Sequence, residues 1–143
     1  LQDLFEGKGE YGQITFLAPS NLAIMTYMFN NNFRRVNEIP AAECRRLLEK
    51  LIIPQRILTS DVPRGSRSEA TGEKTGGKTY TLMDGSEAFL WTFQESYLGV
   101  GNAGAVHLWF FIEKFATSQR IYSSNIQTEN GVVQALGHDF LFE

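Results

Sequence analysis

Short apolar segments separated by glycine-containing turns fill the second half of the chain, and they constrain the fold more than any other feature. The segments are rich in aromatic and β-branched residues, which is typical of strands: Thr79–Met83, Ala88–Phe93, Tyr97–Val100 and Ala105–Ile112. The last of them is too apolar for a strand open to water, so another layer must cover it. Helical patterns lie earlier in the chain. Helices early and strands late, without βαβ alternation, predict an α+β domain.

Proline, serine and asparagine residues mark the boundaries of the first predicted elements. Gln13–Leu17 has the pattern of a short buried strand. Pro19 ends it because proline has no backbone N–H for a ladder. Ser20 is placed to cap a following helix, and the asparagine run 30–32 is expected to end that helix.

A second helix is predicted from Pro40 to the residue before Pro54. Its apolar residues recur at the spacing of one helix face: Cys44, Leu47, Leu48 and Leu51. Arg56–Thr59 has the pattern of a new strand. The polar stretch Pro63–Lys78 predicts a loop or a hairpin connection, because glycine, serine, threonine and charged residues dominate it.

The end of the chain predicts one more strand pair, Val132–Leu136 with Phe140–Phe142, after a turn at Asn130-Gly131. Gly131 supplies the backbone freedom that a tight turn requires. The Val132–Leu136 strand and the Gln13–Leu17 strand are both short and apolar, which is typical of neighbouring central strands.

Composition limits the chain to one domain and excludes several partner classes. Its 143 residues suit one core, and the 43 % hydrophobic and 13 % aromatic content is enough to build it. The formal net charge of −3, without a basic run, disfavours nucleic acid as a partner. No apolar segment approaches the roughly 20 residues that span a bilayer. The start at Leu1 suggests a fragment or processed product, so we expect residues 1–143 to form one domain of a larger protein.

One segment, Gly72–Thr79, matches the phosphate-binding pattern G-x-x-x-x-G-K-[ST]. A functional phosphate loop leaves a buried strand and enters a helix, whose N-terminus faces the phosphates. Here the preceding residues are polar and the following ones have a strand pattern. The sequence therefore favours a hairpin loop, and nucleotide binding through Gly72–Thr79 remains the alternative function.

The chain offers few residues for catalysis or metal binding. Cys44 falls on the apolar stripe of a predicted helix, as a small core residue would. His107 alternates within an apolar strand and His138 follows a glycine in a turn-like position, so structural roles are expected for both. No ligand cluster for a metal is evident, and we expect neither a cofactor nor an enzyme activity. The aromatic strands leave open a third function, a module that binds carbohydrate or lipid.

Two segments resemble the paired motifs of fasciclin-like domains, a family of cell-adhesion and extracellular-matrix modules. Thr15–Asn21 (TFLAPSN) is similar to the first motif, and Asn125–Leu136 (NIQTENGVVQAL) is similar to the second. Between them, Leu47–Val62 is similar to the helix-to-strand segment of the family. The chain departs from the family at Lys50-Leu51, where a Tyr-His pair is usual, and we identify it as a divergent or N-terminally trimmed member.

The resemblance implies a fasciclin-like wedge-shaped β-sandwich with several short helices packed around it. It also implies a secreted or membrane-anchored protein, outside the cell or at its surface, that binds a cell-surface receptor, a matrix protein or a homophilic partner. In some members an Asp-Ile pair in the second motif is associated with integrin binding. The matching residues here are Asn125 and Ile126, so the resemblance places the candidate binding site at Asn125, Ile126 and Gln127. Gln134 stands where the family usually has histidine, and Gly137 where it has aspartate.

Overall fold

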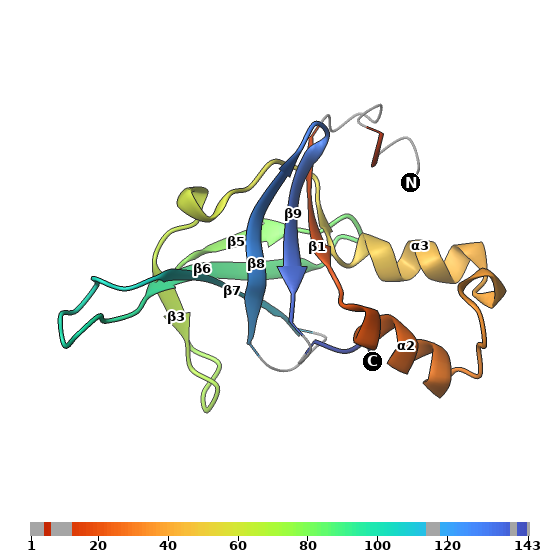
Figure 1. The fold of residues 1–143 in the computed structure, drawn as a ribbon, viewed down its shortest axis with the longest axis horizontal. Helices are drawn as coiled ribbons and strands as arrows, with labels where there is room; N and C mark the ends of the chain where they lie inside the picture. The colour runs from red at the N-terminus through yellow and green to blue at the C-terminus, as the bar shows by residue number, and fades with distance from the viewer. Residues whose placement is uncertain (1–4, 7–12, 114–117, 138–139, 143) are drawn as a thin grey trace.

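A seven-stranded sheet is the main element of the computed structural model, which describes residues 5–6, 13–113, 118–137 and 140–142 (Figure 1). The strand order is β2-β1-β9-β8-β7-β6-β5. Its strands are β1 (Ile14–Ala18), β2 (Ile52–Ile53), β5 (Lys78–Thr81), β6 (Glu87–Gln94), β7 (Val106–Ile112), β8 (Gln119–Thr128) and β9 (Gly131–Leu136). A separate two-stranded hairpin is formed by β3 (Gly65–Arg67) and β4 (Lys74–Gly76).

The sheet curls until its two ends almost meet. The backbone N–H of Met83, just after β5, donates to the carbonyl of Ile52 in β2 across 2.9 Å. Figure 1 shows β1, β8 and β9 crossing β5, β6 and β7 at a steep angle, as a strongly curled sheet requires. The expected mixture of strands and short helices is confirmed. The wedge-shaped sandwich is not confirmed by this topology, because a single curled sheet carries the main strands.

Parallel pairing of β1 with β9 confirms that the two segments are neighbours, and the pair lies in the interior of the sheet beside the edge strand β2. Ile14 pairs with Gly131 and Ala18 with Ala135. The backbones approach so closely at one end that a Cβ on Gly131 would lie 2.0 Å from the carbonyl oxygen of Ile14. Gly131 also has φ +153°, which side chains rarely permit. Only glycine fits this position without moving β1.

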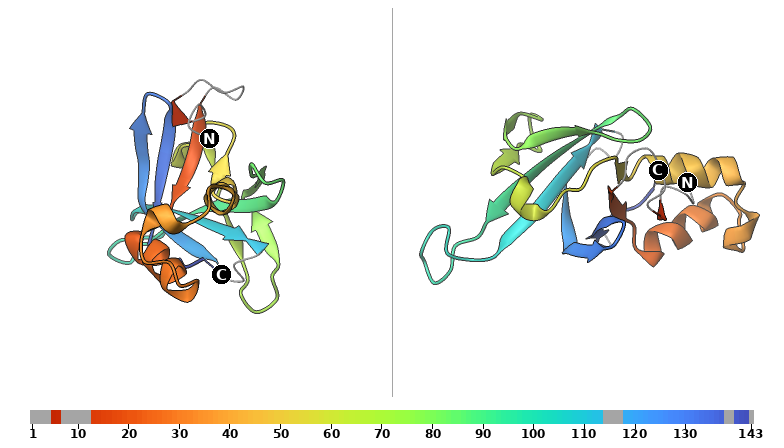
Figure 2. Two further views of the ribbon diagram at one scale, coloured as in Figure 1. Left: turned by 90° about the vertical axis from the view of Figure 1, so that its right-hand side faces the viewer. Right: turned by 90° about the horizontal axis from the view of Figure 1, so that it is seen from above.

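Helices α2 (Asn21–Asn30) and α3 (Ala41–Glu49) lie together at one end of the long axis (Figures 1 and 2). The Ser20 hydroxyl accepts a hydrogen bond from the Ala23 N–H, as expected of a capping residue. The predicted end of α2 in the asparagine run is also confirmed. Short 3₁₀ turns, η1 (Val36–Glu38) and η2 (Thr59–Asp61), lie before α3 and after β2.

The prediction that α3 continues to Pro54 is wrong. The helix ends at Glu49, and Ile52 and Ile53 pair with β1 instead. Two buried β-branched residues gain ladder hydrogen bonds and burial in the sheet, which a continued helix would not provide.

Apolar side chains from the concave face of the sheet and from both helices build the main core. It includes Leu17, Tyr27, Leu47, Leu90, Leu108, Phe110, Ile112 and Leu136. Two residues near the C-terminus, Phe140 and Phe142, complete it. The Phe142 ring stands edge-on to the Tyr27 ring at 5.9 Å, and the Phe140 ring lies 6.2 Å from that of Phe110. These two phenylalanines join the sheet to α2.

Three predicted strands are wrong. Arg56–Thr59 is irregular, because the Ile57 N–H donates to the Thr15 side chain instead of a strand. Tyr97–Val100 is a turn at the tip of the β6–β7 hairpin. Phe140–Phe142 is not a strand, and the antiparallel partner of β9 is β8, which sequence patterns did not reveal. Strand β8 escaped prediction because, apart from Ile121, its side chains are exposed or half-exposed and show no alternation.

The expectation for Pro63–Lys78 is confirmed as a hairpin. Strands β3 and β4 pair antiparallel, with Gly65 opposite Gly76. The hairpin lies against β6, where Arg64 forms a bridge with Thr92 and the Thr92 N–H donates to the Pro63 carbonyl. It therefore covers part of the outer face of the sheet.

The side chain of Thr15 connects the centre of the sheet to the segment after β2. It is fully buried, its hydroxyl donates to the Gln55 carbonyl, and it accepts from the Ile57 N–H, both at 2.8 Å. These two hydrogen bonds hold the irregular segment after β2, in which the Gln55 carbonyl and the Ile57 N–H bond to the Thr15 side chain instead of to a neighbouring strand. Thr15 therefore replaces the strand pairing that residues 56–59 lack.

We expect Thr15→Val to lower the free energy of unfolding by about 1–3 kcal/mol, because it keeps the shape but leaves buried polar groups unpaired. Urea denaturation of the purified domain measures this. The matched control is Thr81→Val, at an exposed position of β5, which should change stability by less than about 0.5 kcal/mol. Equal effects of the two substitutions would contradict the role of Thr15.

Candidate functional site

The three residues singled out by resemblance lie together on β8. Ser123 pairs with Ala135 of β9 and Ile126 pairs with Val133, so two residues of β8 stand opposite one residue of β9. This is a β-bulge, and Asn125 within it has φ +58°. Asparagine tolerates this left-handed conformation better than other side chains do.

The bulge decides which way Ile126 points. Side chains alternate along a strand, so one extra residue moves every following side chain to the other face. An earlier register shift, between Ile121 and Ser123, turns Ser123 to the outer face, and the bulge at Asn125 restores the alternation, so that Ile126 shares the outer face with its partner Val133. Asn125 therefore positions Ile126.

Gln134 of β9 holds the bulge from within and is completely buried. Its Oε1 accepts from the Asn125 N–H at 2.8 Å. Its Nε2 donates to the Ile57 carbonyl at 3.2 Å and to Asn125 Oδ1 at 3.1 Å. A buried amide with these partners is satisfied, and it ties β9, β8 and the segment after β2 into one unit.

The side chain of Asn125 faces the protein, although its residue is exposed. Asn125 Oδ1 accepts from the Thr59 N–H at 2.8 Å and from the Thr59 hydroxyl at 3.0 Å. Sequence patterns did not reveal this contact, because Thr59 and Asn125 are 66 residues apart. With these bonds Asn125 supports the surface on which Ile126 lies.

Ile126 begins an apolar row on the outer face of the sheet. It pairs with Val133 in β9, and Val133 pairs with Phe16 in β1. Paired residues lie side by side on one face, so the row crosses three strands. The Phe5 ring packs edge-on against Phe16 with 5.4 Å between ring centroids. Ile126 is 45 % exposed, so the row opens to solvent at the β8 end. We call Phe16, Val133 and Ile126 the outer row.

Because Gln127 pairs with Val132, the partner of Thr15, it belongs to a polar cluster on the face opposite to the outer row. Its side-chain oxygen accepts from Arg56, and Arg56 Nη1 also donates to Gln13 Oε1 at 3.1 Å. Gln13 in turn donates to the carbonyl of Glu129 at 3.1 Å. Gln127 therefore supports β8 from the face opposite to Ile126, and the exposed Ile126 is the residue of the three that suits contact with another protein surface.

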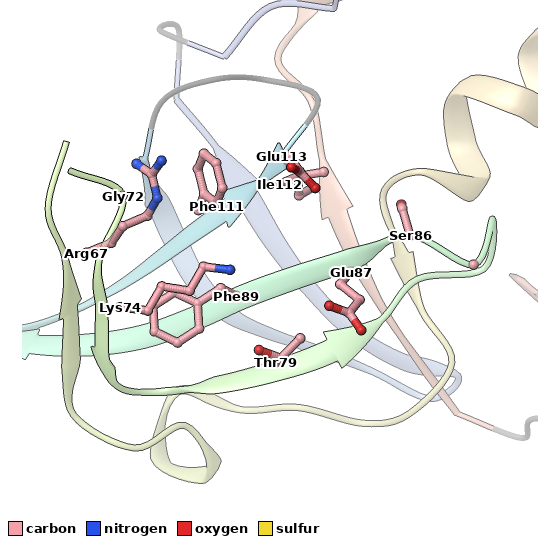
Figure 3. A pocket seen from close by; sticks show the side chains of 11 residues that line it. Arg67, Gly72, Lys74, Thr79, Ser86, Glu87, Phe89, Phe111, Ile112 and Glu113 are labelled. Atoms are coloured by element: carbon pink, nitrogen blue, oxygen red, sulfur yellow. The ribbon is translucent and has the colours of Figure 1, made fainter. Parts of the chain in front are cut away.

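A pocket of about 660 Å³ lies elsewhere, between the β3–β4 hairpin and strands β5–β7 (Figure 3). Figure 3 shows Phe89 and Phe111 on its floor, with Arg67 and Lys74 reaching over from the hairpin. The Arg67 guanidinium carbon lies 3.4 Å from the Phe111 ring centroid, and Lys74 Nζ lies 5.5 Å from that of Phe89. Glu87 and Glu113 also line it. Two cations and two carboxylates leave no dominant charge to select a ligand.

The Gly72–Thr79 segment does not form a phosphate-binding loop, so the alternative function is not supported. It forms β4 and the start of β5, and no helix follows it. A Cβ on Gly77 would lie 2.7 Å from the Leu90 carbonyl oxygen, so this glycine permits close packing on β6. Lys78 Nζ lies 5.3 Å from the Tyr80 ring centroid. Gly77 and Lys78 of the motif thus have structural roles, at the junction of the β3–β4 hairpin with β5.

The aromatic residues of β6 and β7 mostly pack on one another. Trp91 stacks between Phe89 and Trp109, with ring centroids 5.2 and 6.1 Å away. Phe89, Trp91 and Phe111 are buried, partly under the hairpin that carries Arg67. This arrangement fits core packing better than an open platform for a sugar ring. Phe93 is the member of this face that is mainly exposed.

Cys44 and His107, the cysteine and the histidine that the structure describes, have different partners. Cys44 is half-buried against the core, with its Sγ 3.9 Å from the Ile39 carbonyl. His107 Nε2 lies 3.1 Å from Glu95 Oε1, a pairing that sequence spacing did not suggest. The hairpin register explains it, because His107 is paired with Phe93, two residues from Glu95. His138 lies outside the described residues.

Metal and membrane sites were also sought. In residues 5–6, 13–113, 118–137 and 140–142, no group of three or more His, Cys, Asp or Glu side chains is arranged to hold a metal ion. None of the helices in this part of the chain has the length and apolar character needed to cross a membrane.

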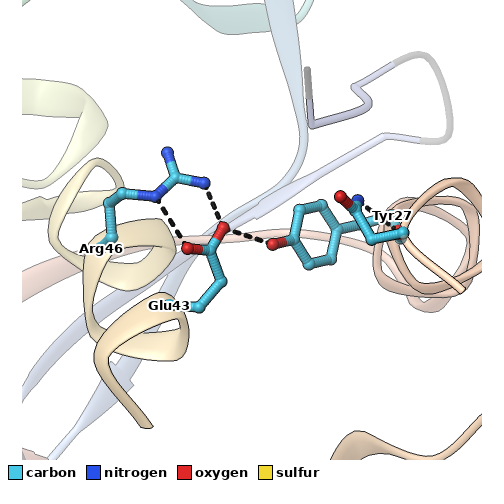
Figure 4. Close-up of polar contacts among 4 residues, drawn as sticks. Tyr27, Glu43 and Arg46 are labelled. Carbon is cyan, nitrogen blue, oxygen red and sulfur yellow. Dashed lines mark hydrogen bonds and ion pairs between the residues drawn. The ribbon is translucent and has the colours of Figure 1, made fainter. Parts of the chain in front are cut away.

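The helix pair contains the most strongly shifted carboxyl group (Figure 4). Glu43 of α3 accepts from Arg46 Nε at 3.2 Å and also from the hydroxyl of Tyr27 in α2. The hydrogen bonds from Arg46 and then Tyr27 lower the Glu43 pKa from 4.5 to about 2. Burial, and then the Glu43 hydrogen bond, raise the pKa of Tyr27. This contact fastens α2 to α3.

We expect Asn125→Ala to be less stable than Asn125→Gly by about 1 kcal/mol. Both substitutions remove the side-chain hydrogen bonds, but only glycine adopts φ +58° without strain. This order reverses the usual one, in which glycine inside a strand is the weaker residue. Chemical denaturation of both variants tests it. Alanine equal to or better than glycine would show that the bulge does not depend on the left-handed conformation.

We expect the stabilising effect of Glu43 to depend on pH. Its folded pKa lies below the unfolded value, so its contribution is complete above about pH 4.5 and is lost as pH falls toward 2. Wild type should therefore melt above Glu43→Gln at neutral pH, and the gap should narrow below pH 4.5. Thermal melts across this range measure it. A gap that stays constant would contradict the pKa shift.

Comparison with known proteins concerns the fold. No family model and no curated protein matches the sequence. Among solved structures, a FAS1 domain pair from the insect cell adhesion molecule fasciclin I matches with a TM-score of 0.55 and 16 % identity. The match covers 88 % of this chain and 36 % of that chain, so this chain spans little more than a third of its length. The chain has a fasciclin-like fold.

Proposed function

We propose that this domain is a non-enzymatic adhesion module that binds another protein through the outer row, at the cell surface or in the extracellular matrix. Two things support the proposal. The fold is similar to part of a FAS1 domain pair from an insect cell adhesion molecule. The residues that the sequence resemblance selects, Asn125, Ile126 and Gln127, lie on a single exposed strand.

The half-exposed Ile126 is the observation that carries the proposal. An irregular strand with a left-handed Asn125 and a buried Gln134 presents one apolar side chain to solvent. A structure that only needed a stable sheet would not require this bulge. Strain and bulges that are held by surrounding bonds are common where a side chain is aimed at a partner.

The three residues have different roles in this proposal. Ile126 makes the apolar contact, whereas Gln127 binds Arg56 on the opposite face of the sheet and supports β8 from there. Asn125 is a positioning residue, because Thr59 and Gln134 occupy its side chain. The partner is a cell-surface receptor, a matrix protein or a second copy of the domain. Surface complementarity provides the mechanism, and no cofactor takes part.

Cell attachment to surfaces coated with the purified domain tests the function. We expect Ile126→Ser to raise the coating concentration needed for half-maximal attachment about five- to tenfold, because roughly 1 kcal/mol of apolar burial is lost. Integrin-blocking reagents, added in parallel, distinguish an integrin partner from other receptors. The melting temperature of each variant must stay near that of wild type.

The matched control is Leu22→Ser on α2. Leu22 is 48 % exposed, close to the 45 % of Ile126, but it lies away from β8. Attachment should survive this change. If Ile126→Ser attaches as well as wild type, the outer row is not the contact. If the wild-type domain supports no attachment at all, the adhesion function itself fails.

A further inference from the structure

The tip of the β6–β7 hairpin is built around an unusual residue. Tyr97 and Val100 exchange two backbone hydrogen bonds of 3.0 Å, which leaves Leu98 and Gly99 as a two-residue turn. Their φ values are +49° and +79°. Positive φ at both central positions defines a type I′ turn, in which asparagine or glycine is strongly preferred at the first.

Leu98 at that first position brings no benefit to the isolated domain. A leucine in the left-handed region costs about 1–2 kcal/mol. Leu98 is also 86 % exposed, so it gains almost no burial in return. Asparagine would relieve the strain and suit the solvent. A residue that is locally unfavourable in two ways points to a role outside the domain.

The surroundings of Leu98 make the tip an apolar projection. Tyr97 and Val100 are also mainly exposed, and Phe93 and Val106 continue the exposed apolar surface toward the body of the domain. From Ser96 to Val106 the sequence contains no charged residue. We call Tyr97, Leu98 and Val100 the hairpin tip.

An apolar hollow of about 840 Å³ lies beside the start of α3. Its apolar lining includes Val36, Ile39, Pro40, Cys44 and Leu48, and Asn37, Glu38 and Arg45 add polar groups. Val36 is mainly exposed, so the hollow offers apolar surface to an incoming side chain. We call it the helix groove. Its volume suits a few side chains of the size carried by the hairpin tip.

The hairpin tip and the helix groove lie at opposite ends of the molecule. Figure 1 shows the β6–β7 hairpin projecting at one end of the long axis and the connection between α2 and α3 at the other. The view from above in Figure 2 shows the same separation. One copy therefore cannot join its own tip to its own groove. Two copies can, and such a head-to-tail contact leaves a free tip and a free groove for further copies.

The charges flanking the two surfaces are complementary. Glu95, at the base of the hairpin, is about half exposed, while its neighbour His107 is mostly covered. Arg34 and Arg35, next to the helix groove, and Arg45 in its lining are exposed, against one carboxylate, Glu38, among the residues that line it. Opposite charges around an apolar contact guide its orientation and association more than they add affinity.

We propose that the hairpin tip of one copy inserts into the helix groove of a second copy, so that domains associate head to tail. Leu98 is the central contact, and its strained conformation aims it outward before binding. The proposal rests on the adhesion function proposed above, for which a second copy is one class of partner. It uses a different surface from the outer row, so each can fail without the other.

Analytical ultracentrifugation of the whole chain, without cells, tests this inference. We expect wild type to self-associate with rising concentration, and Leu98→Asn to weaken association at least about tenfold, as loss of a central apolar anchor does. Asparagine suits the turn, so this variant should fold at least as well as wild type. Val36→Asp in the helix groove should have the same effect from the other side.

Mixing the two variants gives the sharpest result. Leu98→Asn keeps an intact groove and Val36→Asp keeps an intact tip, so the mixture should form one-to-one pairs although each variant alone stays monomeric. Leu22→Asn on α2, at an exposed apolar position away from both surfaces, is the control that should self-associate like wild type.

Three outcomes would overturn the inference. The first is a wild type that stays monomeric at every concentration, and the second is equal association of wild type and Leu98→Asn. The third is failure of the mixture to pair when both variants are folded. Binding of wild type, but not of Leu98→Asn, to phosphatidylcholine vesicles without self-association would assign the tip to a lipid surface instead. A wild type that supports cell attachment but does not self-associate would refute this inference and leave the adhesion function standing.

Discussion

The parallel ladder between β1 and β9 is the constraint on which the rest of the fold depends. It joins strands from near the beginning and near the end of the described chain, and it places both in the interior of the seven-stranded sheet, next to the short edge strand β2. Close approach of the two backbones at Ile14 and Gly131 leaves no room for a side chain. Strand β2 then attaches to one side of this pair and β8 to the other, so the remaining strands take their positions from it.

Polar side chains buried next to this ladder replace hydrogen bonds that the strands do not provide. Thr15 satisfies the backbone of the segment after β2, and Gln134 satisfies Asn125 and Ile57. Both lie on the concave side of the sheet, where an unpaired polar group would be costly. The outer row on the opposite side depends on them, because the bulge that directs Ile126 outward is held through Gln134.

Much of the central fold could be predicted from the sequence, because local signals were strong there. Three local signals each had a single structural interpretation. The proline after β1 ends that strand, Ser20 caps α2, and the glycine at the start of β9 permits the tight turn there. Strand β8 could not be predicted, since two register shifts interrupt its period and most of its side chains face solvent. Resemblance selected Asn125, Ile126 and Gln127. The assignment of Ile126 as the contact residue and of Asn125 as its support depends on Thr59 and Gln134, which only the folded chain brings near Asn125. The left-handed turn at Leu98 had no signal at all, because leucine is not a residue that such turns favour.

The central ladder also determines when the domain can fold during synthesis. Gln13 and Glu129, which bond across it, are 116 residues apart, so β1 leaves the ribosome long before its partner. At about 5–20 residues per second, several seconds pass between the synthesis of β1 and the synthesis of β9. During that time Ile14, Phe16 and Leu17 lie on a strand with both edges open, which favours pairing with other chains. The nascent domain is therefore expected to depend on chaperones that shield its first strand until β9 has emerged.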